Sequence, residues 1–136
     1  MIETLRAVAH PWLCDAMGHL NVRHYVGMFD DASWHLLADL GHGPSDITAT
    51  RIGWADVRHV IEYKDEVASN GLVRIRSEVI KLGRTSLTYR HEMLSAQGAV
   101  LHATMEVVTV AFDLDARKAV EIPALVRERA PGMMPL

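Results

Sequence analysis

Between residues 22 and 40 the apolar side chains recur every three or four positions, which is the spacing of one face of an α-helix. These positions are Tyr25, Val26, Met28, Phe29, Ala32, Leu36, Leu37 and Leu40. Asn21 precedes the run as a good N-cap residue, and Gly41 and Gly43 follow it. The pattern predicts one amphipathic helix of about five turns, with a wide apolar stripe that is deeply buried.

Most of the remaining chain follows a period of two. From Leu72 to Lys81 apolar residues alternate with charged ones, so one face of this strand is apolar and the other is wet. The expected strands are residues 3–10, 53–63, 72–82, 86–94 and 100–112, with a short final strand after a turn at 113–116. Turn signals at Asn70-Gly71, Gly83 and Gly98 separate them. Residues 44–51 are expected to form a loop and residues 130–136 a loose tail.

One long helix and about five antiparallel strands predict an α+β layered fold, because the sheet can bury its apolar face only against that helix. A chain of 136 residues is expected to form a single domain. No internal repeat or linker divides it. One functional site is therefore the most that this length leads us to expect.

Charge and composition exclude several classes of protein. The net charge is −3 without a lysine-rich stripe, which argues against nucleic-acid binding. No apolar stretch approaches the roughly 18 residues of a membrane span, and no targeting segment is evident, so a cytoplasmic location is expected. The single cysteine, Cys14, allows no internal disulfide, and we expect it to be a small packed residue. The eight histidines lack metal-ligand spacing, so no metal site is expected.

Residues 15–25, DAMGHLNVRHY, are the most informative stretch for function. The first amides of a helix lack partners and lie at its positive end, so they stabilise a carbonyl oxygen that gains negative charge. Gly18 lets the preceding loop fold close to these amides. Asp15 is then placed to attack a carbonyl or to activate a water molecule.

The motif D-x-x-G-H-L-N-x-x-x-Y, followed by a long amphipathic helix, resembles the active-site segment of hotdog-fold acyl-CoA thioesterases related to 4-hydroxybenzoyl-CoA thioesterase. This resemblance implies a hotdog fold and hydrolysis of a thioester to a carboxylate and free CoA. It gives Asp15 the role of nucleophile or general base. It also implies a homodimer with sites at the protomer interface, and often a homotetramer. No cofactor is expected, because a thioester carbonyl is already electrophilic and thiolate leaves readily.

Other residues of the motif have two interpretations each. The backbone amide of Val22 is expected to polarise the thioester carbonyl, with Asn21 and Arg23 as helpers. His19 either contacts the thioester or orients Asp15, or it fixes the loop by donating to a backbone carbonyl. Tyr25 lies on the apolar stripe, so it is a core residue or a substrate contact.

A second candidate site is the segment formed by Gly83, Arg84, Thr85 and Ser86. A turn glycine, an arginine and two hydroxyl groups suit contacts to the phosphate or pantetheine groups of CoA, and the family often binds CoA with this part of its sheet. The alternative is an ordinary hairpin turn. Trp12, Trp34 and Trp54 suit the lining of an acyl pocket or part of an aromatic cage for a quaternary ammonium group, but plain packing is the better expectation for each.

Two rival functions remain open. A hotdog protein without catalytic activity could bind acyl-CoA as a sensor, although an intact aspartate has no obvious use in a pure binder. A hotdog enoyl-CoA hydratase or dehydratase has its aspartate close before the asparagine, whereas Asp15 and Asn21 are six positions apart. The residues after Asp15 also depart from the 4-hydroxybenzoyl-CoA enzyme type. The acyl group is therefore open among aromatic, aliphatic and small polar classes.

Overall fold

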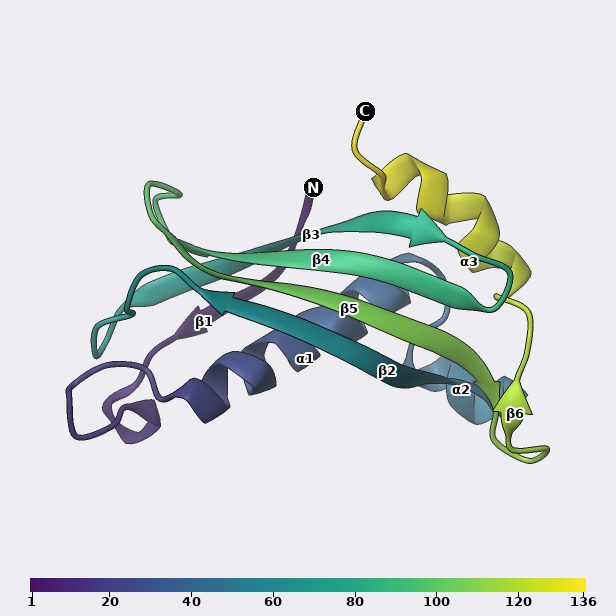
Figure 1. Cartoon of the computed structure of the whole chain (residues 1–136), viewed down its shortest axis with the longest axis horizontal. Coiled ribbons are helices and arrows are strands. Elements are labelled where there is room, and N and C mark those ends of the chain that lie inside the picture. The colour runs from purple at the N-terminus through teal and green to yellow at the C-terminus, as the bar shows by residue number, and fades with distance from the viewer.

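An antiparallel sheet curls around one long helix in the computed structural model, which describes residues 1–136 (Figure 1). The strands are β1 (Ile2–Val8), β2 (Ile52–Tyr63), β3 (Leu72–Leu82), β4 (Ser86–Ser95), β5 (Leu101–Asp113) and β6 (Lys118–Ala119). The helices are α1 (Val22–Asp39), α2 (Pro44–Thr50) and α3 (Ala124–Arg129), with 3-10 turns at Pro11–Leu13 and Ala130–Met133. The sheet order is β1-β3-β4-β5-β2, and β6 pairs with β5. The predicted α+β hotdog fold is thereby confirmed.

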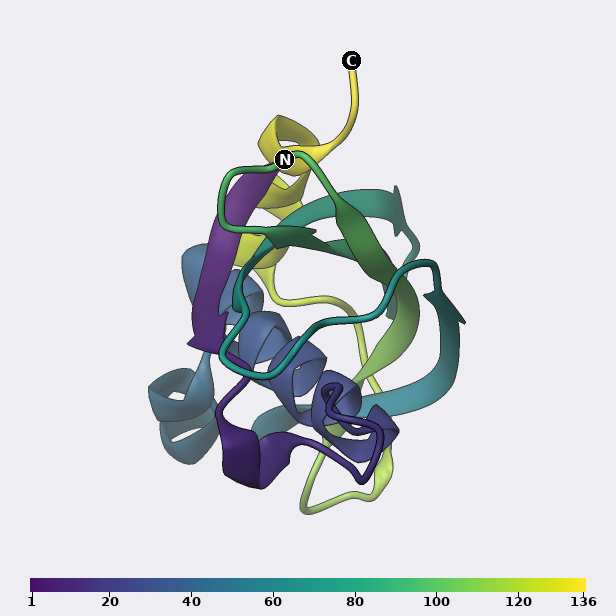
Figure 2. The ribbon, with the colours of Figure 1, turned by 90° about the vertical axis from the view of Figure 1, so that its left-hand side faces the viewer.

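Helix α1 starts and ends where the sequence predicts. The Asn21 side chain accepts a hydrogen bond from the Arg23 amide at 3.1 Å, and Gly41 follows the helix with φ of +96°. Its apolar stripe is fully buried at Phe29, Ala32 and other positions. Figure 2 shows the helix lying inside the curve of the sheet. The stripe therefore forms the centre of the core, as the periodicity requires.

Strands β3 and β4 present one face to the helix and one to solvent. Ile75, Val79 and Tyr89 are fully buried on the inner face. On the outer face Glu92 lies 3.6 Å from the guanidinium groups of both Arg76 and Arg90. The alternation of buried and partly exposed residues confirms the expectation that one face of the sheet is exposed to solvent.

A buried histidine joins the sheet to the helix. His91 of β4 is bonded through Nε2 to the Ser33 hydroxyl at 2.8 Å and through Nδ1 to the Ser77 hydroxyl. The Ser33 hydroxyl donates to the carbonyl of Phe29 at 3.0 Å, so it accepts from Nε2–H, and Nδ1 accepts from Ser77. Thr4 of β1 extends the chain, 2.7 Å from Ser77. Burial lowers the pKa of His91 to about 3, which leaves the imidazole neutral.

Two expectations about the irregular segments are wrong. Pro44–Thr50, within the expected loop at residues 44–51, form α2, because Pro44 starts the helix and the Asp46 carboxylate caps the Gly43 amide at 3.0 Å. Residues 130–133 form a 3-10 turn instead of a loose tail. Ala130 in this turn is fully buried in the core.

Strand β2 forms one edge of the sheet and is open along its length. Its twelve residues pair only with β5, and the middle of the strand is exposed. Val57, at an irregularity in the pairing between Asp56 and Arg58, is 63% exposed. An edge strand of this length, with exposed apolar residues, is a surface suited to pairing with another chain.

Candidate active site

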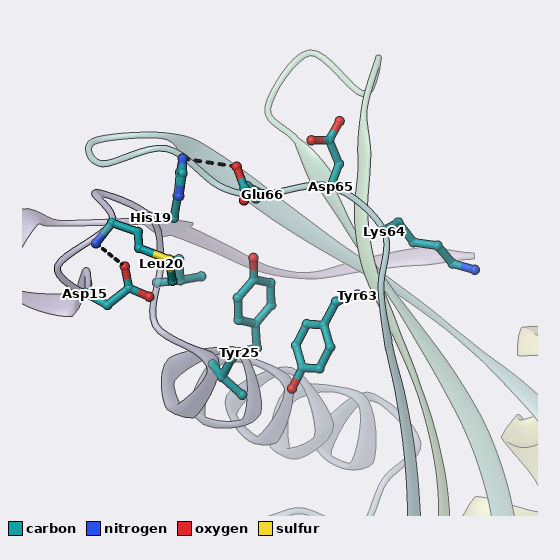
Figure 3. Close-up of a pocket in the computed structure, with 10 residues that line it drawn as sticks. Asp15, His19, Leu20, Tyr25, Tyr63, Lys64, Asp65 and Glu66 are labelled. Carbon is teal, nitrogen blue, oxygen red and sulfur yellow. Dashed lines mark hydrogen bonds and ion pairs between the residues drawn. The ribbon is translucent and has the colours of Figure 1, made fainter.

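A cavity of about 270 Å³ lies where the start of α1 meets the end of β2 (Figure 3). Its lining residues come from two segments of the chain. They are Asp15, Met17, His19, Leu20, Val22 and Tyr25 from the first, and Tyr63, Lys64, Asp65 and Glu66 from the second. The structure thus brings together four residues that the sequence singled out, namely Asp15, His19, Val22 and Tyr25.

The loop that carries Asp15 is a tight hairpin. The Asp15 amide donates to the His19 carbonyl at 3.0 Å, and the Gly18 amide donates to the Asp15 carbonyl at 3.0 Å. Gly18 adopts φ of +80°, which favours glycine. The Met17 amide donates to Oδ1 of Asp15 at 2.9 Å, and no donor of the chain bonds Oδ2. The loop therefore fixes the carboxylate while leaving one oxygen free.

The start of α1 provides one free amide at the same cavity as this carboxylate. The Asn21 amide donates to the Leu13 carbonyl at 2.9 Å, and the Arg23 amide is taken by the Asn21 side chain. Between them, the Val22 amide has no acceptor within the chain. Asn21 and Arg23 therefore have no free amide to offer a substrate, and the Asn21 side chain serves as a helix cap. Of these three amides, only that of Val22 is free to donate a hydrogen bond to a ligand.

His19 is paired with a residue that the sequence did not single out. Its Nε2 lies 3.1 Å from Oε2 of Glu66, and the imidazole forms no hydrogen bond with the Asp15 carboxylate or with a backbone carbonyl. The hairpin is joined to the segment after β2 by backbone bonds as well, from Leu20 to Val67 at 2.8 Å and from Ser69 to Gly18 at 3.1 Å. No local sequence pattern around Glu66 predicts this contact, because the contact depends on how segments distant in sequence pack together.

Two tyrosines form the floor and side of the cavity. The rings of Tyr25 and Tyr63 meet edge to face, with centroids 5.1 Å apart. Tyr25 is buried, and burial raises the pKa of its phenol, against a smaller lowering by a backbone hydrogen bond to Val67. Tyr25 is therefore both a core residue and part of the cavity wall. Tyr63, at the end of β2, was missed by the sequence analysis.

The cavity wall is rich in negative charge. Asp15, Asp65 and Glu66 contribute carboxylates. Lys64 contributes an ammonium group, but it lies 3.1 Å from Glu62 and points away from the other labelled residues in Figure 3. The Asp65 and Glu66 carboxylates also act on Tyr25, since both raise the pKa of its phenol. A negatively charged acyl group would be repelled here.

The segment 83–86 lies at the opposite end of the molecule. It is the turn between β3 and β4, beside α3, whereas the cavity adjoins the last residue of β2 (Figure 1). The Gly83 amide donates to the Ser86 carbonyl at 2.8 Å, and Arg127 donates to the carbonyls of Gly83 and Arg84. Within one chain, this turn and Asp15 do not form a common site.

The three tryptophans are also dispersed. Trp12 is exposed and lies outside the core, and its ring packs by stacking on His10, with ring centroids 4.3 Å apart. Trp34 lies on the second half of α1, and Trp54 of β2 donates to the His42 carbonyl at 3.0 Å. Together they form no aromatic cage. Cys14 is half-buried, with its sulfur 3.5 Å from the His10 carbonyl, as a packed residue would be.

None of the helices combines the length and the hydrophobicity that a membrane span requires. No group of three or more histidine, cysteine, aspartate or glutamate side chains is arranged to hold a metal ion.

Comparisons with solved structures agree with the overall fold. Solved structures of similar fold include the probable thioesterase YbaW from Escherichia coli, with 20% identity, a TM-score of 0.81 and coverage of 99% of this chain and 100% of that one. A hypothetical protein from Staphylococcus aureus in complex with CoA has 13% identity, a TM-score of 0.89 and coverage of 100% and 89%. A DHNA-CoA thioesterase from Staphylococcus aureus has 21% identity, a TM-score of 0.78 and coverage of 89% and 81%.

No curated protein matches the sequence. The family model of the thioesterase-like superfamily matches residues 9–130. This match includes α1, the whole lining of the cavity and β2 to β5. The chain therefore belongs to the thioesterase-like superfamily.

Proposed function

We propose that this protein is an acyl-CoA thioesterase that hydrolyses a thioester to a free carboxylate and CoA. The observation that carries the proposal is the pairing of a carboxylate with one free oxygen, on Asp15, and a free helix amide, on Val22, at the same cavity. The names of the structural neighbours, among them a DHNA-CoA thioesterase and a protein in complex with CoA, support a CoA thioester as substrate.

In the proposed reaction the thioester carbonyl oxygen accepts a hydrogen bond from the Val22 amide. This amide and the positive end of the α1 dipole stabilise the negative charge that develops on the oxygen. The free oxygen of Asp15 then has two routes. In the first, it attacks the carbonyl carbon and expels CoA thiolate to form a mixed anhydride, which water then hydrolyses to the free carboxylate and the regenerated Asp15 carboxylate. In the second, it takes a proton from a water molecule that attacks the carbonyl carbon, the C–S bond breaks to release the carboxylic acid and CoA thiolate, and the proton on Asp15 passes to the thiolate or to solvent.

The first experiment measures thiol release from a panel of short, branched, long, aromatic and trimethylammonium acyl-CoAs. Asp15→Asn is expected to lower kcat/KM on the best substrate by a factor on the order of a thousand, because the amide neither attacks nor takes a proton. Asp65→Asn is the matched control, since it removes a carboxylate from the same cavity without removing the reacting group. Near-full turnover by folded Asp15→Asn would refute the assignment.

The amide donor can be removed separately by Val22→Pro. Proline is well tolerated at the first position of a helix and lacks an N–H, so α1 is expected to be retained. Loss of the oxyanion donor is expected to lower kcat by a factor of about 100 to 1,000. Circular dichroism checks the helix. Unchanged kcat in a folded variant would remove Val22 from the mechanism.

The panel also separates the rival functions. Binding of acyl-CoA without thiol release from any thioester would favour a sensor protein without catalytic activity. Loss of enoyl absorbance from an unsaturated acyl-CoA without thiol release would favour a hydratase.

We further propose that the protein works as a homodimer in which β2 pairs antiparallel with its copy. Antiparallel pairing would put the start of the partner's β2 beside the end of this chain's β2, next to the cavity. The turn at residues 83–86 lies at the same end of the sheet as the start of β2 (Figure 1). The turn joins β4 and β3, the third and fourth strands counted from β2, so with strands about 4.8 Å apart the partner's turn would lie about 10 to 14 Å beyond its β2 and could contact CoA bound at this cavity.

Subunit mixing tests this arrangement. Asp15→Asn and Arg84→Ala are each expected to be impaired, but random heterodimers contain one intact composite site, so mixing restores about a quarter of wild-type activity. Mixing Asp15→Asn with Val22→Pro is the control. Both changes act at the cavity of their own chain, so no heterodimer regains an intact site. Equal recovery in the two mixtures, or none in either, would refute the shared site.

A further inference from the structure

We propose that Glu66 is a positioning residue, which acts by holding the His19 imidazole against the cavity wall and thereby steadies the hairpin that carries Asp15. Only the kinetic part of its test rests on the proposed thioesterase function.

The contact itself is specific. Oε2 of Glu66 and Nε2 of His19 lie 3.1 Å apart, and this is the only polar contact between side chains of the hairpin and of the segment after β2 (Figure 3). The backbones of the two segments are already paired, by the bridge between His19 and Ala68 and by the bond from Leu20 to Val67. The side-chain pair therefore lies on a preformed backbone junction, which lowers the entropy lost in forming it.

Packing against neighbouring side chains does not account for the position of the Glu66 side chain. The Glu66 side chain is 73% exposed, and its carboxylate has no other hydrogen-bond or ion-pair partner. The charged and titratable groups that share the cavity with His19 are Asp15 from the hairpin, Tyr25 from α1, Tyr63 from β2, and Lys64 and Asp65 from the segment after β2. Glu66 alone among them contacts the imidazole.

The contact with Glu66 uses one ring nitrogen of His19 and leaves the other without a hydrogen-bond partner. With Nε2–H donated to Glu66, Nδ1 is free to meet a group of the substrate. A substrate that fills the cavity excludes water, and the attraction between the imidazole and the carboxylate strengthens as the local dielectric constant falls. The pair is therefore expected to contribute more with substrate bound than in the free protein.

The experiment is a double-mutant cycle on kcat/KM with a matched control cycle. Glu66→Gln keeps the shape of the side chain and removes the charge. It is expected to lower kcat/KM about two- to fivefold, the range accessible to an exposed ion pair, mainly through kcat. In the His19→Ala background the same change is expected to have no effect, because the partner is gone. Asp65→Asn, which removes the neighbouring carboxylate, is expected to have the same effect in both backgrounds.

A second readout does not depend on activity. The ring signals of His19 in ¹H–¹⁵N NMR spectra are expected to move in Glu66→Gln and to stay nearly in place in Asp65→Asn. The proposal is overturned if the two variants move these signals equally, or if Glu66→Gln keeps its full kinetic effect without His19. If no acyl-CoA is hydrolysed at all, the proposed function fails, while the spectra still decide whether Glu66 holds His19.

Discussion

The stability of the protein is expected to depend on pH through His91 more than through any exposed histidine. The imidazole is fully buried and uses both nitrogens in hydrogen bonds with Ser33 and Ser77. Burial lowers the pKa of His91 from 6.5 to about 3 in the folded protein. Below about pH 6.5 the unfolded chain takes up a proton at His91 that the folded protein does not, which stabilises the unfolded state.

The size of this loss of stability follows from how far the pH lies below 6.5. Each pH unit below 6.5 lowers the free energy of unfolding by up to about 1.4 kcal/mol, so the loss is about 3 kcal/mol near pH 4 and levels off near pH 3. His91→Gln does not titrate and is expected to lack this loss. At neutral pH the variant is less stable by about 1 to 2 kcal/mol, because glutamine satisfies the two serines less well. Plotted against pH, the free energies of unfolding of the two proteins should therefore cross between neutral pH and about pH 4.

The assay is urea unfolding of both proteins at several pH values from about 7.5 to 4. Carboxylates titrate in both proteins and cancel in the difference. His35→Gln, which removes an exposed histidine from α1, is the control and should follow the wild type. Parallel curves for wild type and His91→Gln would refute the reasoning, because they would show that His91 is equally free to take a proton in the folded and unfolded states.

Two further predictions concern the hairpin and the acyl group. Gly18→Ala should lower the free energy of unfolding by about 1 kcal/mol, because Gly18 has φ of +80° although the space around it is open. Gly27→Ala, inside α1, should raise the free energy of unfolding by up to about 1 kcal/mol, because alanine favours the helix. Urea unfolding measures both changes. A cationic acyl group should be hydrolysed with higher kcat/KM than a neutral one of the same shape, because Asp15, Asp65 and Glu66 surround the cavity. Trimethylammonioacetyl-CoA and tert-butylacetyl-CoA are the matched pair, and equal values would contradict this.

Periodicity was sufficient to predict the main elements of the fold. The helix from Val22 and the strand Leu72–Leu82 were placed correctly because each has a long regular pattern with punctuating residues at its ends. Helix α2 is too short to show a period. It is defined instead by the hydrogen bond from the Gly43 amide to the Asp46 carboxylate. The small and polar residues of this segment alone predict a loop.

The site was predictable only as far as it is local in sequence. Asp15, His19 and Val22 lie within one hairpin and one helix start, so their spacing alone indicates that they meet. Tyr63 and Glu66 reach the same cavity through the register of β2 with β5 and the bridge between residues 19 and 68. No local signal encodes such contacts. The same limit applies to residues 83–86, whose distance from Asp15 is set by the length of the sheet.

The cavity and the core use largely separate residues, and this division bears on how such a protein can evolve. Of the ten residues that line the cavity, only Leu20 and Tyr25 belong to the buried core cluster. Substitutions at the other positions change what the cavity accepts while removing little buried apolar surface. New acyl preferences can therefore arise without loss of foldability, which fits a shape retained at a TM-score of 0.81 with only 20% sequence identity.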